Sequence, residues 1–262
     1  MLDAAGPTQR SAIKSVLLLI CQPDGAKGTG FLLKNGLVIT AAHVVGTRSA
    51  AQVVGLTSMG RSVQFSRLAK DLGKDLAALK PSTAMAGELQ LAPDAQPALE
   101  TAVKTWGYPL MYNGPAPLLS VGYVAGYIAE ANDQGGPVKH LVVNGAFNPG
   151  NSGGPLLKAE TNLVVGVVVA KYHLFPPGLR NAIQTIANNK SGFMHGAIDP
   201  GGNPLKDAQG NPVTFSESEI TGAILQQFYN TAQVMIGEAV SVSELRAFLR
   251  EKGSELDVAS GT

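Results

Sequence analysis

Residues Phe147 to Leu156 read F-N-P-G-N-S-G-G-P-L, and this run directs the interpretation of the 262-residue chain. Ser152 lies between Gly150 on one side and Gly153 and Gly154 on the other, so its backbone carries little steric cover. Glycine permits positive φ angles, which let successive N–H groups turn toward one point. The N–H groups of Gly150 and Ser152 are therefore candidates for an oxyanion hole. Ser152 is a candidate nucleophile, provided that a general base lies nearby.

The candidate base is His43, which follows a predicted β-hairpin. The apolar runs from Gly28 to Leu33 and from Leu37 to Thr40 are typical of strands, and Asn35-Gly36 between them predicts a tight turn. The second run ends in I-T-A-A-H, so His43 stands just past a strand end. A rigid scaffold commonly presents functional side chains at such positions.

The imidazole also needs a group that orients it, and Asp75 is the candidate. It opens the run D-L-A-A-L-K, which predicts a buried strand. Asp71 is a nearby rival, but Leu72-Gly73 after it starts no strand. The three candidates follow one another as His43, Asp75 and Ser152, an order that differs from the Ser-Asp-His order of α/β-hydrolases.

The stretches G-T-G-F-L-L, I-T-A-A-H, D-L-A-A-L-K and N-P-G-N-S-G-G-P-L together resemble the trypsin-like serine peptidases, and more closely their HtrA/Deg branch. The resemblance implies an all-β fold with a few helices, in which two orthogonal antiparallel β-barrels hold the active site between them. One barrel would donate His43 and Asp75 and the other Ser152. The implied activity is a serine endopeptidase that cleaves protein substrates through an acyl-enzyme, without a cofactor.

The whole chain, 1–262, is expected to form one peptidase domain with an insertion. The expected boundaries are 11–90 for the N-terminal barrel, 101–172 and 233–253 for the C-terminal barrel and its C-terminal helix, and 173–232 for the insertion before the last strand. Ser241 and Glu244 predict a capping box at the start of that helix. No PDZ-like module is expected after this helix, which would depart from most HtrA relatives.

The insertion is too long for a simple loop, so we expect it to carry structure of its own. Residues 179–188 and 218–231 are predicted helices, and the turn-rich stretch between them predicts a hairpin. The D-x-D-x-D-G spacing of a calcium loop is absent, and no metal is expected. We expect the insertion to cover or extend the substrate cleft or to contact a regulatory protein partner, with an inert decoration as the alternative.

By resemblance, the residues before the serine and on the facing strand line the pocket for the side chain preceding the cut (P1). These substrate-binding residues are Ala146, Phe147, Asn148, Pro149, Val168, Val169 and Ala170. Ala146 stands where trypsin has its pocket-base aspartate, so we expect a small or medium apolar P1 residue. Lys171 near the rim would further disfavour cationic substrates.

Two departures from the family pattern concern how the site is organised. Asn151 replaces the aspartate that pairs with a freed N-terminal amine in secreted trypsins, so no activating cleavage is expected. The run Val167-Val168-Val169 offers no hydroxyl to support the triad acid. Asp75 is therefore expected to rely on backbone N–H groups.

Composition limits the remaining function classes. The net charge of +1 gives no electrostatic support for nucleic-acid binding. Cys21 is the only cysteine, which excludes an intrachain disulfide, and it is expected to be a small buried residue. The run Val16 to Ile20 is interpreted as the first barrel strand, paired with Phe31-Leu32-Leu33, and not as a signal peptide. Neither a signal nor a membrane span is expected, which favours a cytoplasmic location.

His140 is expected on the surface, and His173 and His195 are expected to have no ligand role. The alternative to an active peptidase is a catalytically weak or latent peptidase-fold binding module that recognises a partner through residues 173–232.

Overall fold

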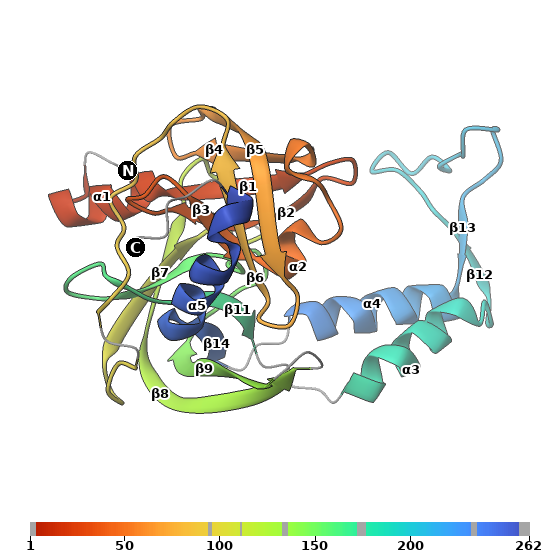
Figure 1. Cartoon of the computed structure of the whole chain (residues 1–262). Helices are drawn as coiled ribbons and strands as arrows, with labels where there is room; N and C mark the ends of the chain where they lie inside the picture. The colour runs from red at the N-terminus through yellow and green to blue at the C-terminus, as the bar shows by residue number, and fades with distance from the viewer. Residues whose placement is uncertain are drawn as a thin grey trace. The chain divides into compact units, whose positions relative to one another are not determined.

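The computed structural model describes residues 4–93, 96–110, 112–132, 136–171, 177–231 and 235–256. The chain divides into two compact units (Figure 1). The barrel unit comprises Met1–Tyr172 and Met235–Thr262, and the insertion unit comprises His173–Val234.

Six strands form the first barrel of the barrel unit: β1 Val16–Cys21, β2 Ala26–Leu32, β3 Val38–Ala41, β4 Val53–Thr57, β5 Ser62–Asp71 and β6 Leu76–Pro81. They are antiparallel and close in the order β1-β2-β3-β6-β5-β4. Val16 pairs with Phe31, as predicted for the first strand. Cys21 at the end of β1 is fully buried, as expected, and burial raises the pKa of its thiol.

The second barrel also has six strands: β7 Ala102–Gly107, β8 Leu118–Asn132, β9 Gly136–Gly145, β10 Pro155–Lys158, β11 Val164–Lys171 and β14 Ile236–Ser241. These close in the order β10-β11-β14-β9-β8-β7, again antiparallel. Two closed antiparallel barrels confirm the predicted fold class. Closure leaves neither sheet with a free strand edge.

Strand β11 is valine-rich because it is buried on both faces, and an irregularity at Val165, where the register against β10 shifts, interrupts its alternation. Val165 and Val168 pack into the core of the second barrel, together with Leu141 and Ala239. Val167 instead belongs to the larger cluster that includes the first barrel. Successive side chains of a strand point to opposite faces, so a strand buried on both sides has no polar positions.

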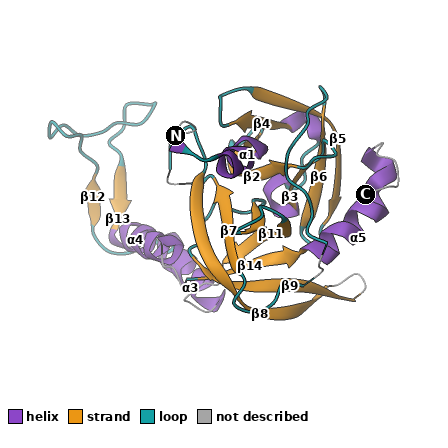
Figure 2. Ribbon diagram, turned by 90° about the vertical axis from the view of Figure 1, so that its left-hand side faces the viewer, coloured by secondary structure: helices purple, strands orange, loops and turns teal. Residues whose placement is uncertain are grey.

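The helix α5 Val242–Lys252 packs against strands of both barrels, including β6 and β11 (Figure 2). Its predicted apolar face is buried, with Phe248 fully covered. Ser241 stands at the N-cap position, but its hydroxyl lies 2.7 Å from Ser243 Oγ and makes no capping bond. Glu244 accepts instead from the backbone N–H of Lys139. The predicted capping box is therefore wrong, because a neighbouring strand offers Glu244 another donor.

Shorter helices complete the barrel unit: α1 Pro7–Ser15, α2 Ala42–Val45, and the 3-10 turns Ala50–Gln52 and Gly253–Leu256. The sequence analysis did not predict α1. Its first residue is Pro7, and proline is favoured in the first turn because its missing N–H would have no partner there.

The insertion unit contains α3 Pro177–Asn188, β12 Met194–Gly196, β13 Thr214–Ser216 and α4 Glu217–Thr231. The two predicted helices and the hairpin between them are confirmed, since β12 and β13 pair antiparallel. The helices α3 and α4 approach closely at Gly222, where any side chain would overlap Ala187.

Among the described residues, no helix combines the length and apolar character that a membrane crossing requires. The predicted cytoplasmic location stays a prediction.

Candidate active site

His43 and Asp75 are brought together by the pairing of β3 with β6, in which Ala41 lies opposite Leu76. His43 is in α2, directly after β3, and Asp75 directly precedes β6. His43 Nδ1 and Asp75 Oδ2 lie 2.7 Å apart. Because the two strand ends are fixed by the sheet, the contact is built into the barrel.

Backbone N–H groups hold the Asp75 carboxylate and its loop. The N–H of His43 donates to Asp75 Oδ1 at 2.8 Å, and the N–H of Ala42 donates to the Asp75 carbonyl at 3.1 Å. Asp75 has a φ of 51°, a left-handed conformation that aspartate tolerates better than most residues. The rival Asp71 accepts instead from the backbone N–H of Lys74, within the turn. Of the two acids, Asp75 is the one in contact with His43.

Ser152 lies in the turn that precedes β10. Its hydroxyl donates to the carbonyl of Val169 at 3.3 Å, and no hydrogen bond to His43 is formed within the described residues. Its own carbonyl accepts from the N–H of Thr29, at 2.9 Å, on the other barrel. The serine turn of the second barrel is therefore bonded directly to a strand of the first.

Thr29 makes further bonds between the barrels. Its hydroxyl donates to the carbonyl of Gly150 at 2.6 Å and accepts from the N–H of Tyr108 at 3.0 Å. The hydroxyl of Thr40 donates to the Thr29 carbonyl at 2.7 Å. A buried hydroxyl that both donates and accepts in this way fixes the serine turn relative to β2.

Two glycines beside the serine are required by the packing. Gly153 has a φ of 84°, and a side chain there would overlap the Thr29 carbonyl and the Thr40 hydroxyl. Gly150 has a φ of 98°, and a side chain would overlap the backbone of Tyr108. Both positions combine a left-handed backbone with a neighbour that leaves no room for Cβ.

The N–H groups of Gly150 and Ser152 form no hydrogen bond within the described part of the chain. The carbonyl of Pro149 accepts from Leu110 N at 2.9 Å. In a trans peptide the C=O and the N–H point in opposite directions, so the Gly150 N–H points away from Leu110.

The family model of the trypsin-like peptidase domain matches residues 28–167, which is more than half of the chain. The chain belongs to the trypsin-like peptidase family. This confirms the predicted family and its enzyme class, the trypsin-like serine peptidases, which are hydrolases.

Several known proteins are similar to this member of the trypsin-like peptidase family. HhoA of Synechocystis is 31% identical over 149 residues, which is 55% of this chain and 36% of HhoA, so the chain matches little more than a third of that relative's length. The Rv3671c protease of M. tuberculosis in its inactive form has a TM-score of 0.60 at 16% identity, covering 94% of this chain and 93% of that one. Deg5 has a TM-score of 0.51 at 23% identity, covering 62% of this chain and 81% of Deg5. The two structures show the fold, and the matches agree with the HtrA/Deg-like branch.

The residues predicted to line the P1 pocket of this trypsin-like chain differ in exposure. Phe147 and Val168 are buried in the core of the second barrel, and Val169 is also buried. Ala146 and Asn148 are half-buried and Pro149 is exposed. The side chains of Ala170 and Lys171, and all of His173, lie outside the described residues.

Sequence reasoning missed one group of charged residues in the barrel unit. Glu130, His140 and Glu238 lie close together on neighbouring strands. The prediction that His140 is a surface residue is wrong, because the side chain is only 8% exposed. The available signal was Glu238, a carboxylate within the apolar strand β14.

Proposed function

We propose that this chain is a serine endopeptidase that hydrolyses peptide bonds of protein substrates. The observation that carries the proposal is the 2.7 Å contact between His43 Nδ1 and Asp75 Oδ2. It stands with Ser152 in a turn whose glycines and hydrogen bonds to the first barrel fix its place. The three residue types then have the roles of nucleophile, base and orienting acid.

In the proposed mechanism Asp75 holds the proton of His43 on Nδ1, which leaves Nε2 free to accept a proton. His43 Nε2 takes the hydroxyl proton as Ser152 Oγ forms a bond to the scissile carbonyl carbon. The N–H groups of Gly150 and Ser152 donate to the resulting oxyanion. His43 gives the proton to the leaving amine as the C–N bond breaks, and a water molecule then releases the acyl group.

One movement precedes this step. The Ser152 hydroxyl donates to the Val169 carbonyl, so it must rotate about its Cα–Cβ bond to donate to His43. Side-chain rotations of this kind occur within nanoseconds, far faster than typical turnover. The bond to Val169 is thus a resting arrangement that substrate binding replaces.

The proposed preference for a small or medium apolar P1 residue is supported by the position of Phe147. Its side chain is 4% exposed and packs so closely on Gly237 that a side chain at position 237 would overlap the ring. Its ring lies in the core of the second barrel, so the apolar neighbour left to line the pocket is the half-buried Ala146. Neither residue offers a carboxylate for a cationic P1 group.

Labelling with a fluorophosphonate tests the proposed activity, because the reagent reacts with activated serines. We expect one covalent adduct on the chain by intact-mass analysis and none on Ser152→Ala. Ser66→Ala serves as a matched control, since Ser66 is an exposed serine of the first barrel that bonds only to a strand carbonyl. Wild-type protein that gains no adduct would contradict the proposal and favour the latent binding module.

A second candidate role concerns the insertion unit, for which we propose contact with a regulatory protein partner or with substrates. Large apolar side chains are exposed there, including Phe193, Ile198 and Phe228. Exposed apolar groups gathered in one small unit are typical of protein interaction sites. Deletion of residues 175–230 is expected to change which protein substrates are cleaved, as measured by comparing digests. Identical digests from both forms would exclude a role in substrate selection.

A further inference from the structure

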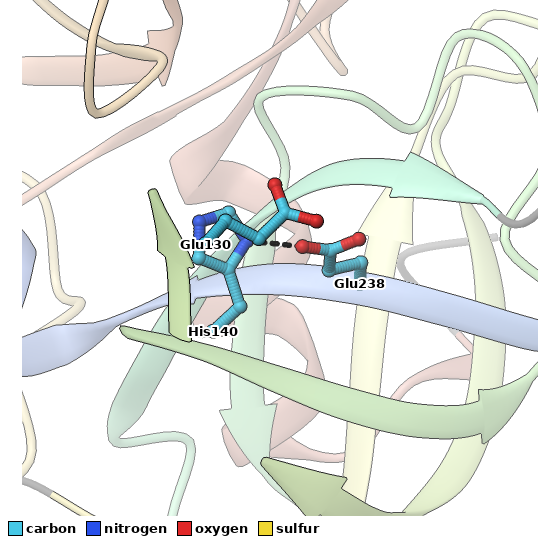
Figure 3. Close-up of side chains that lie close together, drawn as sticks. All are labelled: Glu130, His140 and Glu238. Atoms are coloured by element: carbon cyan, nitrogen blue, oxygen red, sulfur yellow. Dashed lines mark ion pairs between the residues drawn. The ribbon is translucent and has the colours of Figure 1, made fainter. Parts of the chain in front are cut away.

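Three charged side chains lie on one face of the second barrel, where register brings them together. His140 on β9 pairs with Ile128 of β8 on one side and with Val240 of β14 on the other. Glu130 and Glu238 are each two residues from those partners, so they share the face of His140 and lie diagonal to it. Figure 3 shows the three side chains converging from their strands.

Burial makes this cluster unusual for a surface of the barrel. His140 and Glu238 are 8% and 6% exposed, and His140 Nδ1 contacts Glu238 Oε1. The two atoms form an ion pair (Figure 3), but neither makes a hydrogen bond in the described part of the chain. A buried ion pair without hydrogen bonds does not fully offset the hydration that both groups have lost, and a further group would supply the missing interaction.

The balance of charge indicates what that group is. Two carboxylates surround one imidazole, so the cluster carries net negative charge even when His140 is protonated. The same cavity, of about 250 Å³, is also lined by Lys74 and Asp75. The ammonium group of Lys74 is already paired with Glu251 at 3.2 Å. A cation that enters the cavity would complete the neutralisation.

We propose that Glu130, His140 and Glu238 bind a divalent transition-metal cation of the Zn²⁺ type. Each residue offers one ligand atom, and these atoms lie within 4.8 Å of one another. Zinc binds imidazole nitrogen and carboxylate oxygen at about 2.0–2.2 Å in a tetrahedral arrangement, so its ligand atoms lie about 3.4 Å apart. Glu130 is exposed, so its side chain is able to rotate inward to reach that separation.

The ligand set favours this class of ion over the alternatives. Mg²⁺ and Ca²⁺ prefer sites made entirely of oxygen ligands, whereas imidazole is a common ligand of Zn²⁺ and its neighbours. Three protein ligands leave a fourth position for water. All three residues belong to the barrel unit, so the site needs nothing from the insertion unit.

Isothermal titration with ZnCl₂ tests the site, on chelator-treated Ser152→Ala protein that cannot digest itself. We expect one Zn²⁺ per chain, and a dissociation constant raised at least about tenfold by Glu130→Gln. Glu130 is exposed, so this variant keeps the fold and remains informative if the buried variant His140→Gln unfolds. Circular dichroism checks the fold of each variant.

His195→Ala is the matched control. His195 Nε2 lies 3.7 Å from Glu217 Oε1, and both side chains are about half exposed. This His–Glu pair belongs to no three-ligand cluster among the described residues, so its removal should leave Zn²⁺ binding unchanged. No binding by the starting protein, or equal binding by Glu130→Gln, would overturn the proposal. Because the readout is binding by a Ser152→Ala chain, the outcome does not depend on peptidase activity.

Discussion

The barrel unit and the insertion unit place their apolar side chains differently. In the barrel unit most large apolar residues of the strands are buried in two clusters, although Val121 and Tyr123 of β8 are exposed. In the described part of the insertion unit, Ile183 is the one large apolar side chain that is fully buried, whereas Phe193 is 78% exposed. The barrel unit therefore has a core that stabilises it by itself, and the insertion unit depends far more on local hydrogen bonds.

The two units therefore have different roles. A close-packed core positions His43, Asp75 and Ser152 through strand ends that cannot shift independently. The turns at Asp199 and Asp207 instead rest on carboxylates that accept backbone N–H groups two and four residues on. We expect substitutions in the barrel unit to have large effects on catalysis and stability, and substitutions in the insertion unit to have small ones.

The largest expected effect is on catalysis, through Asp75→Asn. The amide no longer accepts the His43 Nδ1 proton as a carboxylate does, so the imidazole adopts the wrong tautomer and kcat falls by about 10⁴-fold. Hydrolysis of a peptide ester measures the loss. Asp71→Asn is the control in the same loop and should stay close to wild type. Equal losses in the two variants would mean that Asp75 acts through the loop and not through His43.

Next in size is a pair of phenylalanine truncations that compare the two units directly. Phe147→Ala removes a buried ring and is expected to lower the free energy of unfolding by about 3–5 kcal/mol. Phe193→Ala removes an exposed ring and should change it by no more than about 0.5 kcal/mol. Urea unfolding followed by fluorescence of Trp106, which lies in the barrel unit, measures both. A large loss with Phe193→Ala would show that the insertion supports the barrels.

The smallest expected effect is a pH dependence that differs between the units. Hydrogen bonds from the backbone N–H of Asn203 lower the pKa of Asp199 below its ordinary 3.8, and those from Asn211 do the same for Asp207. Because the pKa is lower in the folded state, the ionised carboxylate stabilises each turn above about pH 4. That contribution is lost as the pH falls through the folded pKa. Hydrogen-exchange protection of Asn203 and Asn211 should therefore decrease below pH 4.

In the barrel unit the pH effect appears at the alkaline end. Burial raises the pKa of Tyr108 from 10 to about 12, so the neutral phenol stabilises the fold below pH 10. That contribution is lost between pH 10 and pH 12.

For the insertion unit, hydrogen-exchange protection of the Asp199 and Asp207 turns that stays unchanged from pH 6 to pH 3 would contradict the proposed role of their carboxylates.

Much of the fold could be predicted because its signals are local. The glycines around Ser152, the Asn35-Gly36 turn and the strand ends at His43 and Asp75 each restrict the backbone where they stand. The two helices of the insertion are segments with turn residues beside them, and the structure confirms both helices. The role of the triad residues stays a prediction, although the contact between His43 and Asp75 is present.

Other features depend on contacts that sequence neighbours do not reveal. The cluster at His140 arises from the register of three strands that are distant in the chain, so no spacing rule identifies it. Glu244 does not form the predicted cap, because its carboxylate accepts a hydrogen bond from the backbone N–H of Lys139. The position of the Phe147 ring depends on Gly237, which returns to the barrel only after the insertion.

The return of the chain in β14 has a consequence for synthesis. Strand β14 lies between β11 and β9, and Lys171 pairs with Gly237, so the chain leaves and re-enters the second barrel at neighbouring points. A nascent chain cannot close this barrel until the whole insertion has been made. The entropic cost of holding the two ends together grows only with the logarithm of the loop length, about 0.6 kcal/mol for each doubling. Insertions of very different length could therefore occupy this position while the barrels, and the serine turn bonded across them, stay unchanged.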